Sequence, residues 1–117
     1  MARLGSNVKL TLDAAGAALA RKTFEGALGA QPIEPMPDLT VYRFADGGNV
    51  GVYTVPDGEA LTGKQQGLGA WLEFAVDDVQ AARAACEAAG CAPFVYGEGT
   101  LTYLRGPGGL CFRLSKG

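Results

Sequence analysis

The side chains that could carry chemistry in this sequence are limited by one absence, since the chain contains no histidine. Histidine is the commonest general base and the commonest metal ligand in proteins. Any catalysis would therefore have to use Glu, Asp, Lys, Tyr or Cys. The sole tryptophan, Trp71, offers a large π surface, and tryptophan often serves as a stacking platform for planar ligands.

The cysteines do not indicate a metal cluster. Cys86, Cys91 and Cys111 are an odd number, and their spacing contains no CxxC motif. This usage favours reduced, mostly buried thiols of an intracellular protein over a zinc site or a disulfide framework. We therefore expect neither a metal nor any other cofactor.

Composition sets the outer limits on the class of protein. Hydrophobic residues make up 48% of the chain and charged residues 19%, values typical of a globular protein. A net charge of −2 and the lack of a basic tract argue against a nucleic-acid partner. No apolar run is long enough for a membrane span, and residues 1–6 lack an apolar signal core, so a cytoplasmic location is expected.

An internal repeat organises the elements that must position these side chains. Residues 29–32 (Gly-Ala-Gln-Pro) recur 61 positions later as residues 90–93 (Gly-Cys-Ala-Pro). Residues 8–13 match residues 72–77 at an offset of 64, so the first helical region is about three residues longer than the second. The repeat predicts a single domain formed by two similar modules.

Each module begins with an alternating strand and continues into a helix. Leu72, Phe74 and Val76 share one face of the second such strand, and Val8, Leu10 and Leu12 share one face of the first. Asp13 and the pair Asp77-Asp78 are N-cap candidates for the helices, and Gly29 and Gly90 are C-cap candidates. The buried stripe of each helix is rich in alanine, which predicts close packing against a sheet.

Three short strands follow the helix in each module, and the last two are joined by hairpin turns at residues 45–48 and 106–109. We therefore predict an α+β domain spanning residues 1–117. Module 1 covers approximately residues 5–55 and module 2 approximately residues 70–117, each a βαβββ unit. Residues 56–69 carry a Pro-Asp-Gly turn, several more glycines and little periodicity, so a linker loop is expected there.

Paired βαβββ units of this length resemble the vicinal oxygen chelate superfamily, which includes glyoxalases, ring-cleaving dioxygenases and bleomycin-resistance proteins. The resemblance covers nearly the whole chain and is strongest in residues 74–90 and 103–114. It implies a pseudo-twofold arrangement of curled mixed sheets that form a cleft, with helices on the outer face. It also implies a homodimer, since family members cover open sheet edges and concave faces by pairing chains.

Metal-dependent members place a His at the start of the first strand of each module and a Glu in the last strand. Carried over by position, these sites are Asn7, Trp71 and Arg113 in this chain. An indole has no lone pair to give, a guanidinium repels cations, and an amide oxygen coordinates only weakly. The resemblance thus predicts a member without the usual metal site.

The same resemblance places a set of side chains toward the cleft: Trp71, Glu73, Arg113, Asn7, Lys9, Tyr96 and Tyr103, with Cys111 beside them. Trp71 is either a stacking platform for a planar ligand or an indole of the core or of a dimer interface. Glu73, Lys9 and Arg113 form either a structural ionic group or a recognition site for a polar ligand. Glu73 is also a weak candidate for a general base.

Two functions remain open at this point. The leading hypothesis is a metal-independent protein that binds a small aromatic or amphipathic molecule, as drug-sequestering relatives of bleomycin-resistance proteins do. The alternative is a lyase or isomerase of the glyoxalase type, using a displaced metal site or Glu73 as base. Metal content and metal-dependent turnover distinguish the two.

Overall fold

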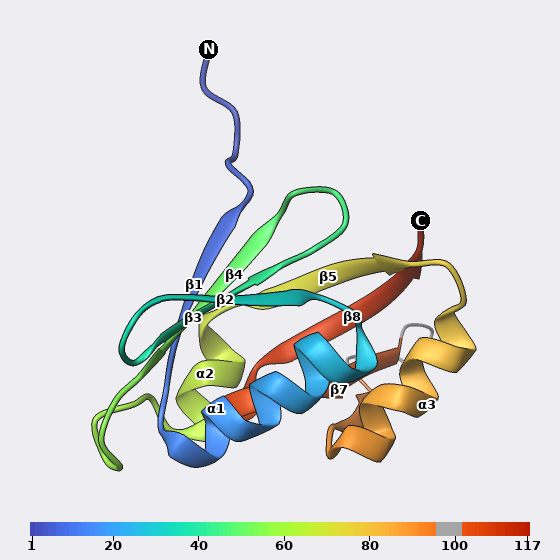
Figure 1. Ribbon diagram of the computed structural model, residues 1–117. Coiled ribbons are helices and arrows are strands. Elements are labelled where there is room, and N and C mark those ends of the chain that lie inside the picture. Colours follow the sequence, from blue (N-terminus) through green and yellow to red (C-terminus); the bar gives the residue numbers. More distant parts are fainter. Residues whose placement is uncertain (96–101) are drawn as a thin grey trace.

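The computed structural model describes residues 1–95 and 102–117, and within them the chain forms two four-stranded mixed sheets with helices packed beneath them (Figure 1). In the first module β1 pairs in parallel with β4, and β4, β3 and β2 follow as antiparallel neighbours, giving the order β1-β4-β3-β2. Its elements are β1 (Asn7–Leu12), α1 (Ala14–Ala20), η1 (Arg21–Ala27), β2 (Gln31–Met36), β3 (Leu39–Arg43) and β4 (Asn49–Thr54).

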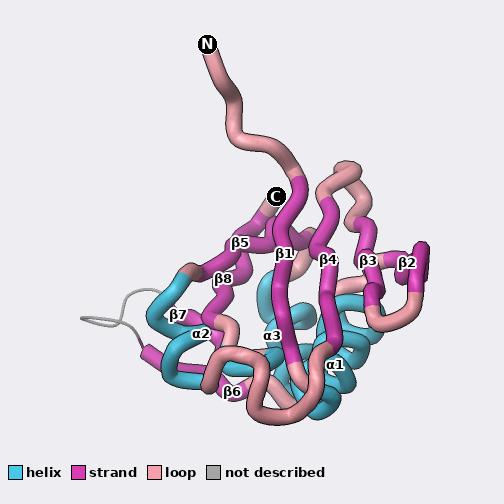
Figure 2. The backbone as a smooth tube through the Cα atoms, turned by 90° about the vertical axis from the view of Figure 1, so that its left-hand side faces the viewer, coloured by secondary structure: helices cyan, strands magenta, loops and turns pink. Residues whose placement is uncertain are grey.

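The second module repeats this topology strand for strand. Its order is β5-β8-β7-β6, again with one parallel pair and two antiparallel pairs. Its elements are β5 (Trp71–Val76), α3 (Val79–Ala89), β6 (Ala92–Val95), β7 (Thr102–Arg105), η2 (Pro107–Gly109) and β8 (Cys111–Lys116). The predicted α+β class and the two repeated modules are therefore confirmed. The two sheets lie at an angle to each other and do not close into a barrel (Figure 2).

The helices begin at the predicted caps, and α3 ends at Gly90 as predicted, whereas the C-cap of η1 is Leu28, one residue before the predicted Gly29. The Asp13 side chain accepts a hydrogen bond from the Gly16 backbone N–H at 2.9 Å, and Asp78 accepts one from Ala81 at 3.1 Å. Of the Asp77-Asp78 pair, Asp78 is the cap, whereas the backbone carbonyl of Asp77 accepts a hydrogen bond from Lys116 Nζ. Such caps satisfy backbone donors that the first helical turn leaves unpaired.

The first helical region changes its winding midway. After α1 it continues as η1, a π-helix whose wider turns are rare in proteins. Phe24, on the predicted stripe, is fully buried in η1. Helix α3 packs against η1, and both helical regions lie side by side beneath the sheets in Figure 1. No helix among the described residues is long and apolar enough to cross a membrane.

The segment between the modules is not a simple loop, contrary to expectation. It contains α2 (Gly63–Gly69), which begins at a capping box in which the side chains of Thr62 and Gln65 bond each other's backbone N–H groups. Gln66 is buried, and α2 packs against η2. The glycine content concealed this helix, because intrinsic propensity disfavours glycine in helices while reciprocal capping and tertiary packing stabilise one here.

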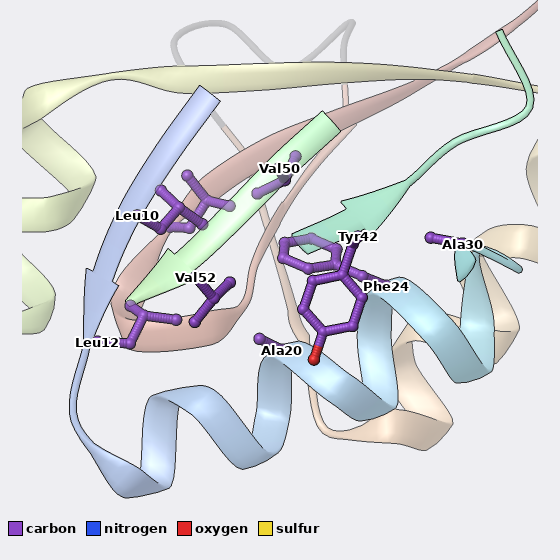
Figure 3. Packing of buried hydrophobic residues seen from close by; sticks show 9 residues of the cluster. Leu10, Leu12, Ala20, Phe24, Ala30, Tyr42, Val50 and Val52 are labelled. Carbon is purple, nitrogen blue, oxygen red and sulfur yellow. The ribbon is translucent and has the colours of Figure 1, made fainter. Parts of the chain in front are cut away.

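The core consists of two adjoining clusters of buried side chains. The first fills the space between sheet 1 and the α1–η1 helix around Phe24 and Tyr42, whose rings meet edge to face at 5.4 Å (Figure 3). It also contains Leu110 from the second module. The second cluster surrounds Phe112 beneath sheet 2. Leu72 and Phe74 of β5 contact both clusters, so the modules share apolar contacts.

Candidate functional site

One face of sheet 2 gathers four of the seven predicted site residues. Trp71 and Glu73 alternate along β5, Arg113 lies directly opposite Glu73 on β8, and Tyr103 lies opposite Arg113 on β7. Residues that pair directly across strands point to the same side of a sheet. The alternation read from the sequence therefore brings these side chains together.

Glu73 and Arg113 form an ion pair. Arg113 Nη1 donates a hydrogen bond to Glu73 Oε2 at 2.9 Å, and the two side chains are 30% and 45% exposed for Arg113 and Glu73 respectively. A partly exposed pair of this kind is worth little to stability, because water screens it. The pair matters for the chemistry of the site, because the Arg113 guanidinium occupies one oxygen of the Glu73 carboxylate.

Trp71 is not a core residue. Its side chain is 53% exposed, and its ring meets Tyr103 edge to face, with centroids 5.8 Å apart and planes at 88°. Tyr103 is 9% exposed, so it packs against the indole but leaves almost none of its own ring open to a ligand. The arrangement leaves a tryptophan surface open to a planar partner, whether a small molecule or another chain.

Cys111 pairs with Trp71 across β5 and β8 but is buried. Burial raises the pKa of the Cys111 thiol, and the nearby charge of Arg105 offsets this only in part. A thiol with a raised pKa stays protonated near neutral pH and is a poor nucleophile. Cys111 thus shares the sheet face of Trp71, but its side chain is covered.

Asn7 and Lys9 lie on sheet 1 and have other partners. Asn49 Nδ2 donates a hydrogen bond to Asn7 Oδ1 at 2.9 Å, and Lys9 Nζ lies 5.0 Å from the centroid of the Tyr53 ring. The expected ionic group of Glu73, Lys9 and Arg113 is therefore corrected to the pair of Glu73 and Arg113. The spacing of these residues along the sequence could not reveal that Lys9 lies on sheet 1, apart from Glu73 and Arg113 on sheet 2. Tyr96 lies outside the described residues.

The three positions that correspond to metal ligands do not fit a divalent cation. Asn7 is engaged by Asn49, Trp71 presents an indole, and Arg113 carries a positive charge that pairs with Glu73. In the described part of the chain no three His, Cys, Asp or Glu side chains gather as a metal site would require. The donor chemistry at this place favours an organic polar group over a metal ion.

The other two buried thiols, Cys86 and Cys91, lie at the junction of the modules. The Cys91 Sγ is 3.3 Å from the hydroxyl of Thr23 in η1. Hydrogen bonding from Cys86 lowers the pKa of Cys91 to about 7, and the same contact together with burial raises the pKa of Cys86. These side chains pack α3 against η1, and both thiols are almost fully covered.

Sequence reasoning missed a cavity of about 400 Å³ between the modules. Leu72, Phe74 and Val76 are each half-buried: they pack against the core clusters on the helix side of the sheets, and their remaining surface lines this cavity. Phe44 and Asp46, from the hairpin that joins β3 and β4, line the opposite side. A contact between distant modules leaves no periodic signal in either one, so the sequence pattern could not predict it.

Comparison with solved structures identifies the class of protein that this fold defines. The chain has the fold of glyoxalase/bleomycin resistance proteins, with two repeated βαβββ modules, consistent with the vicinal oxygen chelate superfamily. No family model matches the sequence, and no curated protein sequence matches it. The similarity is therefore structural.

Three of these structures illustrate its extent. A glyoxalase/bleomycin resistance protein from Albidiferax ferrireducens is 25% identical with a TM-score of 0.65, the match covering 94% of this chain and 96% of that one. A gene product from Arabidopsis thaliana is 16% identical with a TM-score of 0.70, covering 98% and 100%. A bleomycin resistance determinant encoded on transposon Tn5 is 19% identical with a TM-score of 0.52, covering 93% and 95%.

Proposed function

We propose that the chain is a metal-independent binding protein for a small planar molecule with a polar edge. The observation that carries this proposal is the open indole of Trp71 on the same sheet face as the Glu73–Arg113 pair. An indole supplies stacking area at low entropic cost, and the adjacent ion pair supplies hydrogen-bond partners that fix the orientation of a ligand. The superfamily fold supports a ligand-binding role but does not select the ligand.

The chemistry of the site favours capture over turnover. General-base catalysis needs a carboxylate that is free to take a proton from the substrate. One oxygen of Glu73 instead accepts a hydrogen bond from the Arg113 guanidinium and is therefore already engaged. A glyoxalase-type lyase or isomerase would require this pair to separate or a metal to bind elsewhere.

The protein is proposed to act as a homodimer. Both sheets are open, and several large apolar side chains on or beside them are exposed, among them Ile33, Met36, Tyr53 and Trp71. A second copy would cover such edges and faces. Light scattering at micromolar concentration is then expected to give twice the 12.0 kDa chain mass, and a monomer mass would remove this part of the proposal.

The deciding experiment measures metal and ligand in the same preparation. Protein purified without chelator is analysed for bound metals, and a panel of planar aromatic compounds is titrated while the fluorescence of the single tryptophan is followed. We expect substoichiometric metal and at least one saturable quench that EDTA does not change. A stoichiometric metal that EDTA removes and that switches on turnover would replace this proposal with the enzymatic one.

A further inference from the structure

A groove between the two modules has the size and lining of a second ligand site. Its volume is about 400 Å³, within the usual range for small-molecule pockets. One wall is the edge strand β5, from Leu72 to Val76, and the other comes from the start of β1 and the β3–β4 hairpin. The groove therefore exists only because the modules meet at this seam.

Aromatic surface dominates the inner wall of the groove. The rings of Phe44 and Phe74 lie 5.1 Å apart with their planes tilted by 31°, and both are only half-buried. Val8, at the mouth, is 37% exposed. Both rings also pack against Phe24, and the ring surface that remains open in the seam favours a flat apolar partner.

The polar groups of the groove carry one sign of charge. The charged residues that line it, within the described chain, are Asp46 and Glu73, both acidic. Glu73 is paired with Arg113, which leaves Asp46 as the principal charge. One oxygen of Asp46 accepts a hydrogen bond from the Gly48 N–H at 2.9 Å, and the side chain stands exposed in the hairpin turn. In addition, among the described strands β5 pairs with β8 alone, so its other edge presents backbone hydrogen-bonding groups.

We infer that this groove binds a small amphipathic cation, with its aromatic part against Phe44 and Phe74 and its positive end near Asp46. The site is distinct from the Trp71 face, because successive residues of a strand point to opposite sides. Leu72 and Phe74 line the groove and Trp71 does not, whereas Glu73, which is paired with Arg113, borders both sides of β5. One strand thus serves two sites, and the second does not depend on the first.

The test uses three probes that share one bicyclic ring and differ in charge. These are 1-naphthylmethylamine, 1-naphthylmethanol and 1-naphthoate, titrated by calorimetry into the full chain. The Trp71→Ala variant, which removes the π face, is titrated in parallel, so that stacking on the indole is separated from binding in the groove. We expect the amine to bind most tightly, by about fivefold over the carboxylate at low salt, and the preference to shrink as salt screens Asp46.

Two pairs of variants locate the binding. Val8→Trp fills the mouth of the groove and is expected to weaken the amine at least tenfold, whereas Ile33→Trp, at a strand position of similar 38% exposure outside the groove, leaves it unchanged. Asp46→Asn preserves the hydrogen bond from Gly48 but removes the charge, so it is expected to abolish the preference for the amine. Asp57→Asn, in an exposed turn outside the groove, is the matched control.

The outcomes distinguish this inference from the proposed function. Amine binding that survives Trp71→Ala and is lost in Val8→Trp supports the groove, whatever the Trp71 face binds. Binding lost in Trp71→Ala and kept in Val8→Trp places the probe on the Trp71 face and overturns the groove. Equal affinity for all three probes, or a Val8→Trp variant that changes only the oligomeric mass, also overturns it.

Discussion

The loss of stability in Trp71→Ala distinguishes an exposed ligand platform from a buried core or interface residue. Replacing a fully buried Phe or Trp by Ala costs about 3–5 kcal/mol. Trp71 is 53% exposed, so Trp71→Ala should cost about half of that, roughly 2 kcal/mol, including the edge-to-face contact with Tyr103. With an unfolding entropy of about 2.1 cal/mol/K per residue, this lowers the melting temperature by about 8 °C for a chain of this length.

Ligand binding should respond more selectively than stability. A planar ligand stacked on the indole gains on the order of 1 kcal/mol beyond area burial, so Trp71→Ala should weaken binding about fivefold or more. Trp71→Phe keeps a smaller π face and should retain most of the affinity. Its own stability cost should remain below about 1 kcal/mol, because the ring position beside Tyr103 is preserved.

The assay combines thermal melts with ligand titrations of the wild type and both variants. Titrations of the variants use calorimetry, since they lack the fluorescent reporter. Melts are repeated at several protein concentrations, because an interface residue makes the melting temperature depend on concentration. A loss near 5 kcal/mol, or a loss that appears only as dimer dissociation with unchanged ligand affinity, would refute the assignment of Trp71 to a ligand platform.

Three further predictions test other parts of the structure. A double-mutant cycle with Glu73→Gln and Arg113→Met should give a coupling energy of about 0.5 kcal/mol by denaturant melts, since the pair is partly exposed; a coupling above 3 kcal/mol would mean a buried pair. Gly109→Ala should lower the free energy of unfolding by more than about 2 kcal/mol, because Gly109 has φ +92° and an added Cβ would collide with the α2 backbone. Gly26→Ala, at a position with open space around it, serves as the control. Burial raises the pKa of Cys111 above its ordinary 9.0, so the wild type should lose stability relative to Cys111→Ala as pH rises above 9, where the unfolded thiol ionises first; a constant difference between pH 8 and 10 would contradict this.

The parts of the fold that sequence could predict are those with local physical signals. Alternation located β1 and β5, the aspartates located the helix starts, and the glycine-rich turns located both hairpins. Helix α2 escaped notice because its stability comes from reciprocal capping and from packing on η2, not from residue propensity. The π-helical winding of η1 was equally hidden, since an apolar stripe does not report how tightly the backbone turns.

The candidate site was predictable only where one module supplies all of it. Glu73 and Arg113 meet because strand pairing within the second module fixes their register. Lys9, from the first module, lies instead over Tyr53, and the groove around Phe44 and Phe74 was not foreseen. Contacts between modules depend on their relative orientation, which is decided by the packing of a few large side chains and has no sequence period.

The position of Leu110 has a consequence for how the protein is made on the ribosome. This side chain is 1% exposed and belongs to the apolar cluster of the first module, although it lies between β7 and β8 of the second module. The first sixty residues can collapse as they emerge, but a core cluster with an empty leucine position remains open to water and to other nascent chains. The core of the first module is therefore complete only after the last hairpin has been synthesised. A chain truncated before Leu110 would have two incompletely packed modules, instead of one folded module and one unfolded module.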